Sequence, residues 1–182
     1  RRGQGKFDEA IDAYQKALEA TEHTANQSRD LARVQRELHG LLVSAGRERD
    51  AEQLFHQVRA RCEDYAESNE MYSRWELAWF LVTWPDSRFH DAPKAIELAG
   101  QLVKEDPTVG YYWRTLGAAH LRRNDPASAI SALEKANECA GGGSPWEWYF
   151  LAMAHWQLGN KEEALTWFER AKKVTPGGVN SP

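Results

Sequence analysis

Histidines are the side chains in this chain whose types and spacing could do chemistry. His90 is followed directly by Asp91, and an imidazole beside a carboxylate can act as a general base. His120 and His155 recur 35 residues apart, and histidines that a fold brings together can hold a metal ion. No nucleophile accompanies the first pair, and no carboxylate or cysteine evidently completes a ligand set for the second. The sequence therefore predicts neither an enzyme nor a metal or cofactor site.

A glycine run and two cysteines carry weaker signals. Gly141-Gly142-Gly143-Ser144 precedes an expected helix start, where backbone N–H groups can bind an anion. It lacks the G-K-[ST] of a phosphate loop, so a flexible connector is the favoured interpretation. Cys62 and Cys139 stand alone, without a C-x-x-C motif. This pattern favours two small apolar helix residues in a reducing compartment.

The composition is that of a soluble folded protein with an acidic balance. Of 182 residues, 42% are hydrophobic and 27% charged, and the net charge is −4. This charge disfavours a nucleic-acid partner, for which a basic excess is expected. No apolar run approaches the roughly 18 residues that a membrane span needs. The first residues do not lead into the apolar core of a signal peptide, so we expect a cytoplasmic protein without membrane insertion.

One residue pattern occurs twice in the C-terminal third of the chain, and it sets the elements that must position these side chains. The pattern is Trp113, Leu116, Gly117, His120, Ala129, Leu133 and Ala136, followed by Trp148, Leu151, Ala152, His155, Ala164, Phe168, Ala171 and finally Pro176. A period of about 35 residues reading W-x2-L-G-x2-Y, A-x3-F and P resembles the tetratricopeptide repeat (TPR). The resemblance implies an all-α fold, a right-handed superhelical solenoid of helix pairs A and B that binds other proteins.

The repeat period predicts how the chain is divided. We expect a single solenoid over residues 1–176, with a partial repeat at 1–22, repeats at about 28–62, 68–106, 110–140 and 145–176, and a frayed tail at 177–182. Because residues 5–18 have the pattern of a B helix without a preceding A helix, we expect a fragment cut within a repeat. The third repeat carries an extra loop from Trp84 to Asp91. Asp91, Asp125-Pro126 and Ser144-Pro145 are predicted helix starts.

Three stretches of the C-terminal half narrow the resemblance. They look like the TPR tails of large bacterial serine/threonine kinases and related signalling proteins, and they read LAWFLVTWPDSRFHDAPKAIELA, YYWRTLGAAHLRRNDPASAISALEKA and WYFLAMAHWQLGNKEEALTWFERA. In that family the kinase domain normally lies far upstream. Its catalytic motifs, G-x-G-x-x-G with a strand lysine, H-R-D and D-F-G, do not occur here. The resemblance implies the regulatory end of a signalling protein, without its chemistry.

The family also suggests where a partner would bind. In TPR proteins, helix A side chains two before the signature tryptophan, and one, five, eight and nine after it, line the concave face. The resemblance therefore predicts a partner-binding groove that includes Tyr72, Trp75, Trp79, Tyr111, Arg114, Arg122, Trp146, Tyr149, Met153 and Trp156. Aromatic residues and arginine dominate binding hot spots. Such a groove suits an extended peptide or an amphipathic helix, with arginines holding a carboxylate.

Two alternatives stay open at the level of sequence. Some of these aromatic side chains could be buried between adjacent A helices, and others could cap the open end of the solenoid. The chain could also be a structural spacer or self-association element, with the groove filled by its own chain and a homo-oligomer as the result. Substitution of Trp156 and Tyr149 separates these cases, because groove residues affect partner binding and core residues affect the melting temperature.

Overall fold

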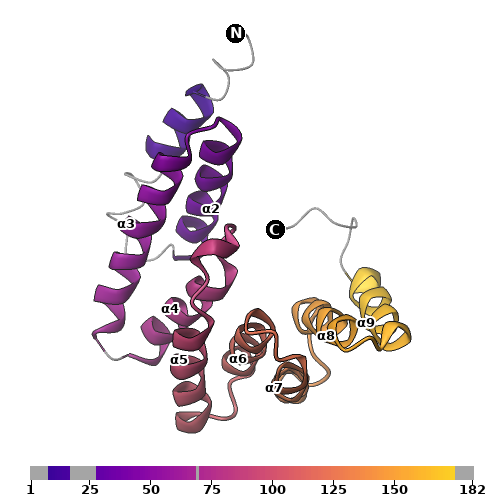
Figure 1. The fold of residues 1–182 in the computed structure, drawn as a ribbon. Coiled ribbons are helices and arrows are strands. Elements are labelled where there is room, and N and C mark those ends of the chain that lie inside the picture. Colours follow the sequence, from indigo (N-terminus) through magenta and orange to yellow (C-terminus); the bar gives the residue numbers. More distant parts are fainter. Residues whose placement is uncertain (1–7, 17–27, 69, 175–182) are drawn as a thin grey trace. The chain divides into compact units, whose positions relative to one another are not determined.

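The computed structural model describes residues 8–16, 28–68 and 70–174, and within these ranges it contains helices and no strand. Residues 8–16 are helical. The further elements are α2 (Ser28–Ser44), α3 (Glu48–Ala66), α4 (Met71–Thr83), the short 3-10 helix η1 (Ser87–Phe89), α5 (Ala92–Glu105), α6 (Gly110–Arg122), α7 (Pro126–Cys139), α8 (Pro145–Gln157) and α9 (Lys161–Val174) (Figure 1). The predicted all-α fold is confirmed. The predicted tail at 177–182 and the start of the partial repeat lie outside the described residues.

The chain divides into two compact units. The first unit comprises Arg1–Tyr65 and Trp84–Phe89, and the second comprises Ala66–Thr83 and His90–Pro182. The single solenoid over residues 1–176 stays a prediction, and the two units are described separately below.

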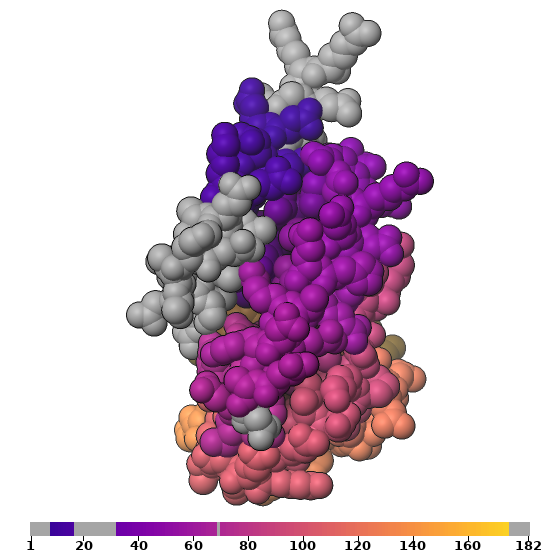
Figure 2. All heavy atoms as spheres, turned by 90° about the vertical axis from the view of Figure 1, so that its left-hand side faces the viewer, coloured from indigo at the N-terminus to yellow at the C-terminus, as the bar shows by residue number. Residues whose placement is uncertain are grey.

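The first unit has its core on α2 and α3. Apolar side chains of α2 are buried every fourth residue, at Val34, Leu38 and Leu42, which places them on one face of the helix. The matching face of α3 buries Ala51, Leu54, Phe55 and Val58. Figure 2 shows the outer surface of α3, which is rich in charged residues. Each of these two helices therefore has one apolar face, as expected for the A and B helices of the divergent repeat predicted at about 28–62.

The extra loop of the third repeat belongs to the core of the first unit. Phe89 stacks on Phe55 of α3, with ring centroids 4.4 Å apart. Trp84 is buried and meets the His39 ring edge-on at 5.1 Å. Asp86 accepts a hydrogen bond from the backbone N–H of Arg88 at 3.0 Å, which closes the turn at η1. The loop is thus an aromatic packing element rather than an open insertion.

The second unit consists of three helix pairs. Helices α4, α6 and α8 are the A helices, and α5, α7 and α9 are the B helices. Each helix packs on the next in sequence order, and successive A helices also contact one another. The predicted helix starts are confirmed: Asp91 accepts a hydrogen bond from the N–H of Lys94, and Asp125 one from the N–H of Ser128, both at 3.2 Å. Helix α8 begins with a capping box at Ser144.

The A and B helices of the fourth repeat cross at Gly117. A Cβ atom on Gly117 would lie 2.6 Å from Cγ of Leu133 and 3.2 Å from the carbonyl oxygen of Ala129. Leu133 is fully buried and has no room to move aside. The glycine of the repeat pattern is therefore required by the close approach of α6 and α7.

We expect Gly117→Ala to lower the free energy of unfolding by about 1–3 kcal/mol, because the added methyl group overpacks this crossing. Gly100, inside α5, is the matched control, since a Cβ there meets nothing within 4 Å. Gly100→Ala should raise stability by about 0.5–1 kcal/mol, because alanine is the better helix former. Urea denaturation of both variants measures the difference, and equal effects would contradict the assignment of the crossing.

The glycine run is a structural turn. Gly141, Gly142 and Gly143 all have positive φ angles, of 61°, 121° and 83°. A Cβ on Gly143 would lie 1.7 Å from Oδ1 of Asn137, the atom that accepts a hydrogen bond from Nε1 of Trp148 at 3.0 Å. The run is the expected connector between α7 and α8, and the close contact at Gly143 requires a glycine there.

Candidate interaction surface

The ten residues predicted to line a groove all lie on or at the end of the A helices of the second unit, and they divide into three groups and a pair of arginines. The first group occupies one equivalent position near the start of α4, α6 and α8. It consists of Tyr72, Tyr111 and Trp146, whose side chains are 40%, 37% and 47% exposed. We call these three residues the aromatic ladder. They are large apolar side chains that the fold leaves open to solvent at every A helix of this unit.

The second group joins neighbouring A helices. Nε1 of Trp75 donates a hydrogen bond to Oγ1 of Thr115 at 3.0 Å, and its ring lies 4.8 Å from that of Tyr111. The ring of Trp79 meets Phe150 edge-on at 6.2 Å. Both tryptophans are half-buried. Their contacts hold α4 against α6 and bring α4 to α8, which is the packing alternative considered from the sequence.

The predicted arginines make hydrogen bonds within the chain. Nη1 of Arg114 lies 2.9 Å from Oε1 of Glu147, and the guanidinium of Arg114 lies 5.6 Å from the centre of the Trp79 ring. Nε of Arg122 donates to the carbonyl oxygen of Val82 at 2.9 Å. Burial lowers the pKa of Arg122. These contacts tie α4, α6 and α8 together, and a partner carboxylate would have to compete with them.

The third group lies on α8. Met153 and Trp156 are exposed, and Tyr149 is half-buried with its ring 5.9 Å from that of Phe168 on α9. In the preceding repeat, the residues equivalent to Met153 and Trp156 are Ala118 and Leu121, which are both buried. These two side chains therefore occupy positions that stack between repeats elsewhere in the unit.

An ion pair and a buried tyrosine lie among α4, α5 and α6. Arg74 is buried and forms a bidentate ion pair with Glu105 of α5, with Nη1 2.8 Å from Oε1. The hydrogen bonds from Arg74 hold the pKa of Glu105 below its ordinary value. Burial raises the pKa of Tyr112 to about 12. The ion pair joins α4 to α5, and the ring of Tyr112 lies 4.7 Å from that of Tyr111 in the ladder.

Two of the histidines that were considered for chemistry contact acidic side chains of their own repeats. Nδ1 of His120 lies 3.3 Å from Oδ2 of Asp125, and Nδ1 of His155 lies 3.6 Å from Oε2 of Glu163. Each histidine thus faces an acidic residue at the start of the B helix in its own repeat. Within the described residues, no group of three or more histidine, cysteine or acidic side chains is placed to hold a metal ion. Asp91 serves as a helix cap.

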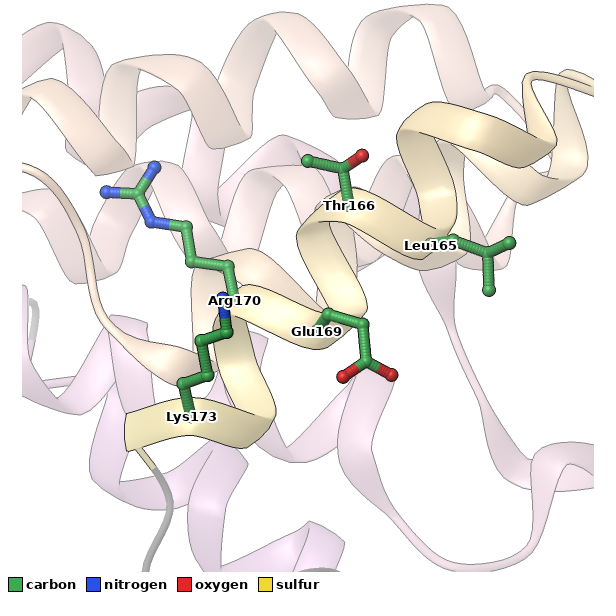
Figure 3. A pocket seen from close by; sticks show the side chains of 5 residues that line it. All are labelled: Leu165, Thr166, Glu169, Arg170 and Lys173. Carbon is green, nitrogen blue, oxygen red and sulfur yellow. The ribbon is translucent and has the colours of Figure 1, made fainter.

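A surface hollow on α9 has no enclosing wall. It is lined by residues of this one helix, Leu165, Thr166, Glu169, Arg170 and Lys173. Figure 3 shows their side chains pointing away from the helix in different directions. Such a shape does not enclose a small molecule, which a ligand site usually does.

Sequence reasoning missed two residues that position the A helices. Thr115 is fully buried and receives the hydrogen bond from Trp75, and Glu147 is almost fully buried and receives the one from Arg114. Glu147 also accepts hydrogen bonds from the N–H and hydroxyl of Ser144. The S-x-x-E spacing of Ser144 and Glu147 is the sequence signal of a capping box, so this role of Glu147 could have been found.

Comparison with protein families identifies the repeat. Models described as the tetratricopeptide repeat match residues 1–28, 88–144 and 145–177. Together these segments span more than half of the sequence, and the chain belongs to the tetratricopeptide repeat family. Residues 29–87, which include the divergent repeat and the first half of the inserted loop, fall outside the matches. No catalytic family is indicated, and the repeats define a protein-interaction scaffold.

Solved structures of MamA have a similar fold. A structure described as MamA AMB-1 aligns with a TM-score of 0.51 and 18% identity, covering 91% of this chain and 95% of that chain. MamA MSR-1 aligns with a TM-score of 0.49 and 18% identity, covering 95% of this chain and 97% of that chain. At this level of identity the likeness shows the fold alone. No curated protein matches the chain. Among the described helices, none has the length and apolar character of a membrane span.

Proposed function

We propose that the aromatic ladder of the second unit binds an extended peptide segment of a partner protein. The observation that carries the proposal is the exposure of Tyr72, Tyr111 and Trp146 at one equivalent position of three successive A helices. Large aromatic side chains that stay in solvent at each repeat are typical of interaction surfaces.

Two of the three ladder residues, Tyr72 and Tyr111, are also held in place before any partner binds. The ring of Trp75 lies 5.3 Å from that of Tyr72 and 4.8 Å from that of Tyr111, and Trp75 is itself fixed by Thr115. Side chains that are already ordered lose little conformational entropy on binding. A peptide running across the starts of α4, α6 and α8 would meet one aromatic side chain per helix, which suits an extended chain whose apolar residues alternate.

The proposed biological setting is a bacterial signalling protein in the cytoplasm. Its support is the resemblance of three C-terminal stretches to the TPR tails of bacterial serine/threonine kinases and related proteins. In that setting the chain would recruit a substrate or a regulator, and the chemistry would reside in another domain.

A peptide selection tests the proposal. Random linear peptides displayed on phage are selected on the immobilised chain, and one selected peptide is then labelled and its affinity measured by fluorescence anisotropy. Tyr72→Ala/Trp146→Ala should weaken binding by about 30-fold or more, because loss of a hot-spot residue removes at least about 2 kcal/mol. The melting temperature should change little, since both side chains are about half exposed.

Tyr65→Ala is the matched control. Tyr65 lies on α3 in the first unit and is 46% exposed, so its removal deletes a similar apolar surface that is not part of the ladder. Unchanged affinity in the ladder variant, or an equal loss in the Tyr65 variant, would contradict the proposed site. The predicted alternative, a spacer whose groove is filled by its own chain, predicts that no peptide is selected.

A further inference from the structure

The last helix pair of the second unit exposes apolar residues at positions that the preceding pair buries. Repeat by repeat, the exposed fraction rises from 2% at Ala118 to 43% at Met153, from 6% at Leu121 to 58% at Trp156, and from 0% at Leu133 to 37% at Phe168. Leu165 is 56% exposed, whereas its equivalent Ile130 is partly buried. We call Met153, Trp156, Leu165 and Phe168 the terminal face.

The preceding pair shows what kind of element covers such a face. Leu121, Ala129 and Leu133 form one cluster with Leu151 and Ala154 of α8. A packed helix therefore covers these positions in the fourth repeat. In the fifth repeat all four positions carry exposed apolar side chains, and three of them are larger than their equivalents, so the terminal face has the chemistry of a helix-docking surface.

The charges at the two ends of α9 are complementary to those of a second, antiparallel α9. The first turn of α9 is acidic, with Glu162 and Glu163, and its last turn is basic, with Lys172 and Lys173. If two α9 helices lie antiparallel, the acidic turn of each copy faces the basic turn of the other. The opposed helix dipoles favour the same arrangement. Lys172 already lies over the Phe168 ring, 5.5 Å from its centre, at the edge of the apolar surface.

We propose that the terminal face is a self-association surface on which a second copy of this chain docks, with α9 antiparallel to α9 of the other copy. The four apolar side chains expose on the order of 400 Å² in total, taking about half of each large side chain. A standard stable interface buries about 800 Å² per partner. The dimer is therefore weak, and its population depends on protein concentration. The proposal does not depend on peptide binding at the aromatic ladder.

Light scattering of the full chain across a concentration series tests the pairing. The weight-average mass of the unchanged chain should rise from monomer towards dimer. Leu165→Glu should weaken the association by about tenfold or more, because it places a charge in a desolvated contact. Val43→Glu is the control, since Val43 of α2 is an apolar residue that is 43% exposed and lies outside both the terminal face and the charged turns of α9. Equal weakening by both substitutions would overturn the proposal.

A charge exchange tests the antiparallel arrangement. Lys172→Glu/Lys173→Glu makes both ends of α9 acidic, and Glu162→Lys/Glu163→Lys makes both ends basic. Each variant alone should stay monomeric, whereas a mixture of the two should form a heterodimer, because each acidic turn then meets a basic one. Circular dichroism checks that both variants fold. A mixture that stays monomeric while the unchanged chain dimerises would overturn the proposed geometry.

Three other results have defined meanings. A chain that stays monomeric at every accessible concentration overturns the proposal and leaves a different protein or chain as the occupant. A dimer that survives Leu165→Glu also overturns it. Tyr72→Ala/Trp146→Ala should leave the mass unchanged, and this variant separates failure of the proposed peptide site from failure of the proposed dimer.

Discussion

Trp148→Ala is expected to lower the free energy of unfolding of the second unit by about 3–5 kcal/mol, the range for loss of a buried tryptophan. The side chain is buried within the last repeat. Its Nε1 donates to Asn137 of α7 at 3.0 Å, and the guanidinium of Arg170 on α9 lies 4.3 Å from the ring centre. One ring thus joins three helices, and its removal leaves a cavity as well as an unpaired amide oxygen.

Trp156→Ala is the control for this prediction, because it makes the same change on the same helix at a side chain that is exposed. It should alter the free energy of unfolding by less than about 1 kcal/mol. This figure includes loss of the cation–π contact with Lys161, whose Nζ lies 5.7 Å from the centre of the Trp156 ring. Urea denaturation at low protein concentration gives both values without a contribution from self-association. Comparable losses for the two variants would show that Trp156 is also part of the core.

The helix pairs could be predicted because each residue of the repeat pattern acts on structure that is close to it in the sequence. Gly117 allows α6 and α7 to approach, Asp91 and Asp125 cap the B helices, and Pro145 begins α8. These effects operate within one helix hairpin, so the sequence of a single repeat is enough to predict them. They recur at a fixed period, and the period then identifies the family.

Contacts between repeats could not be predicted in the same way. The Trp75–Thr115 and Arg114–Glu147 hydrogen bonds join equivalent faces of neighbouring A helices, but different residue types make them in each case. The repeat period in the sequence therefore does not reveal which residues form such a pair. The inserted loop is a second example, because the stacking of Phe89 on Phe55 joins residues of two different repeats.

The position of a residue within the repeat also does not determine whether a neighbour covers it. Leu121 and Trp156 are equivalent in sequence, yet one is buried and the other exposed. The difference is that α8 packs over Leu121, whereas no described helix covers Trp156 in this way. The predicted groove therefore combined exposed side chains of two surfaces, the aromatic ladder and the terminal face, for which we propose different roles.

Glu147→Ala is the second substitution with a large expected effect, a loss of about 3–5 kcal/mol in the free energy of unfolding. The carboxylate of Glu147 is almost fully buried and accepts hydrogen bonds from Arg114 at 2.9 Å and from the N–H of Ser144 at 2.8 Å. Alanine leaves the half-buried guanidinium of Arg114 without its counter-charge. It also removes the half of the capping box that Glu147 supplies to the N–H of Ser144.

A double-mutant cycle with Arg114→Met isolates the ion pair from the cap. Methionine keeps an apolar stem beside Trp79 but removes the charge, so each single substitution should be destabilising. Their combination should cost less than the two single losses added together, with a coupling of about 1–3 kcal/mol. The exposed pair of Lys135 and Glu138, 2.8 Å apart on α7, is the control, and Glu138→Ala should change stability by less than about 1 kcal/mol. Additive losses at Arg114 and Glu147 would mean that solvent already screens the pair, and that α6 and α8 are held together by the packing of Leu121 against Leu151 and Phe150 instead.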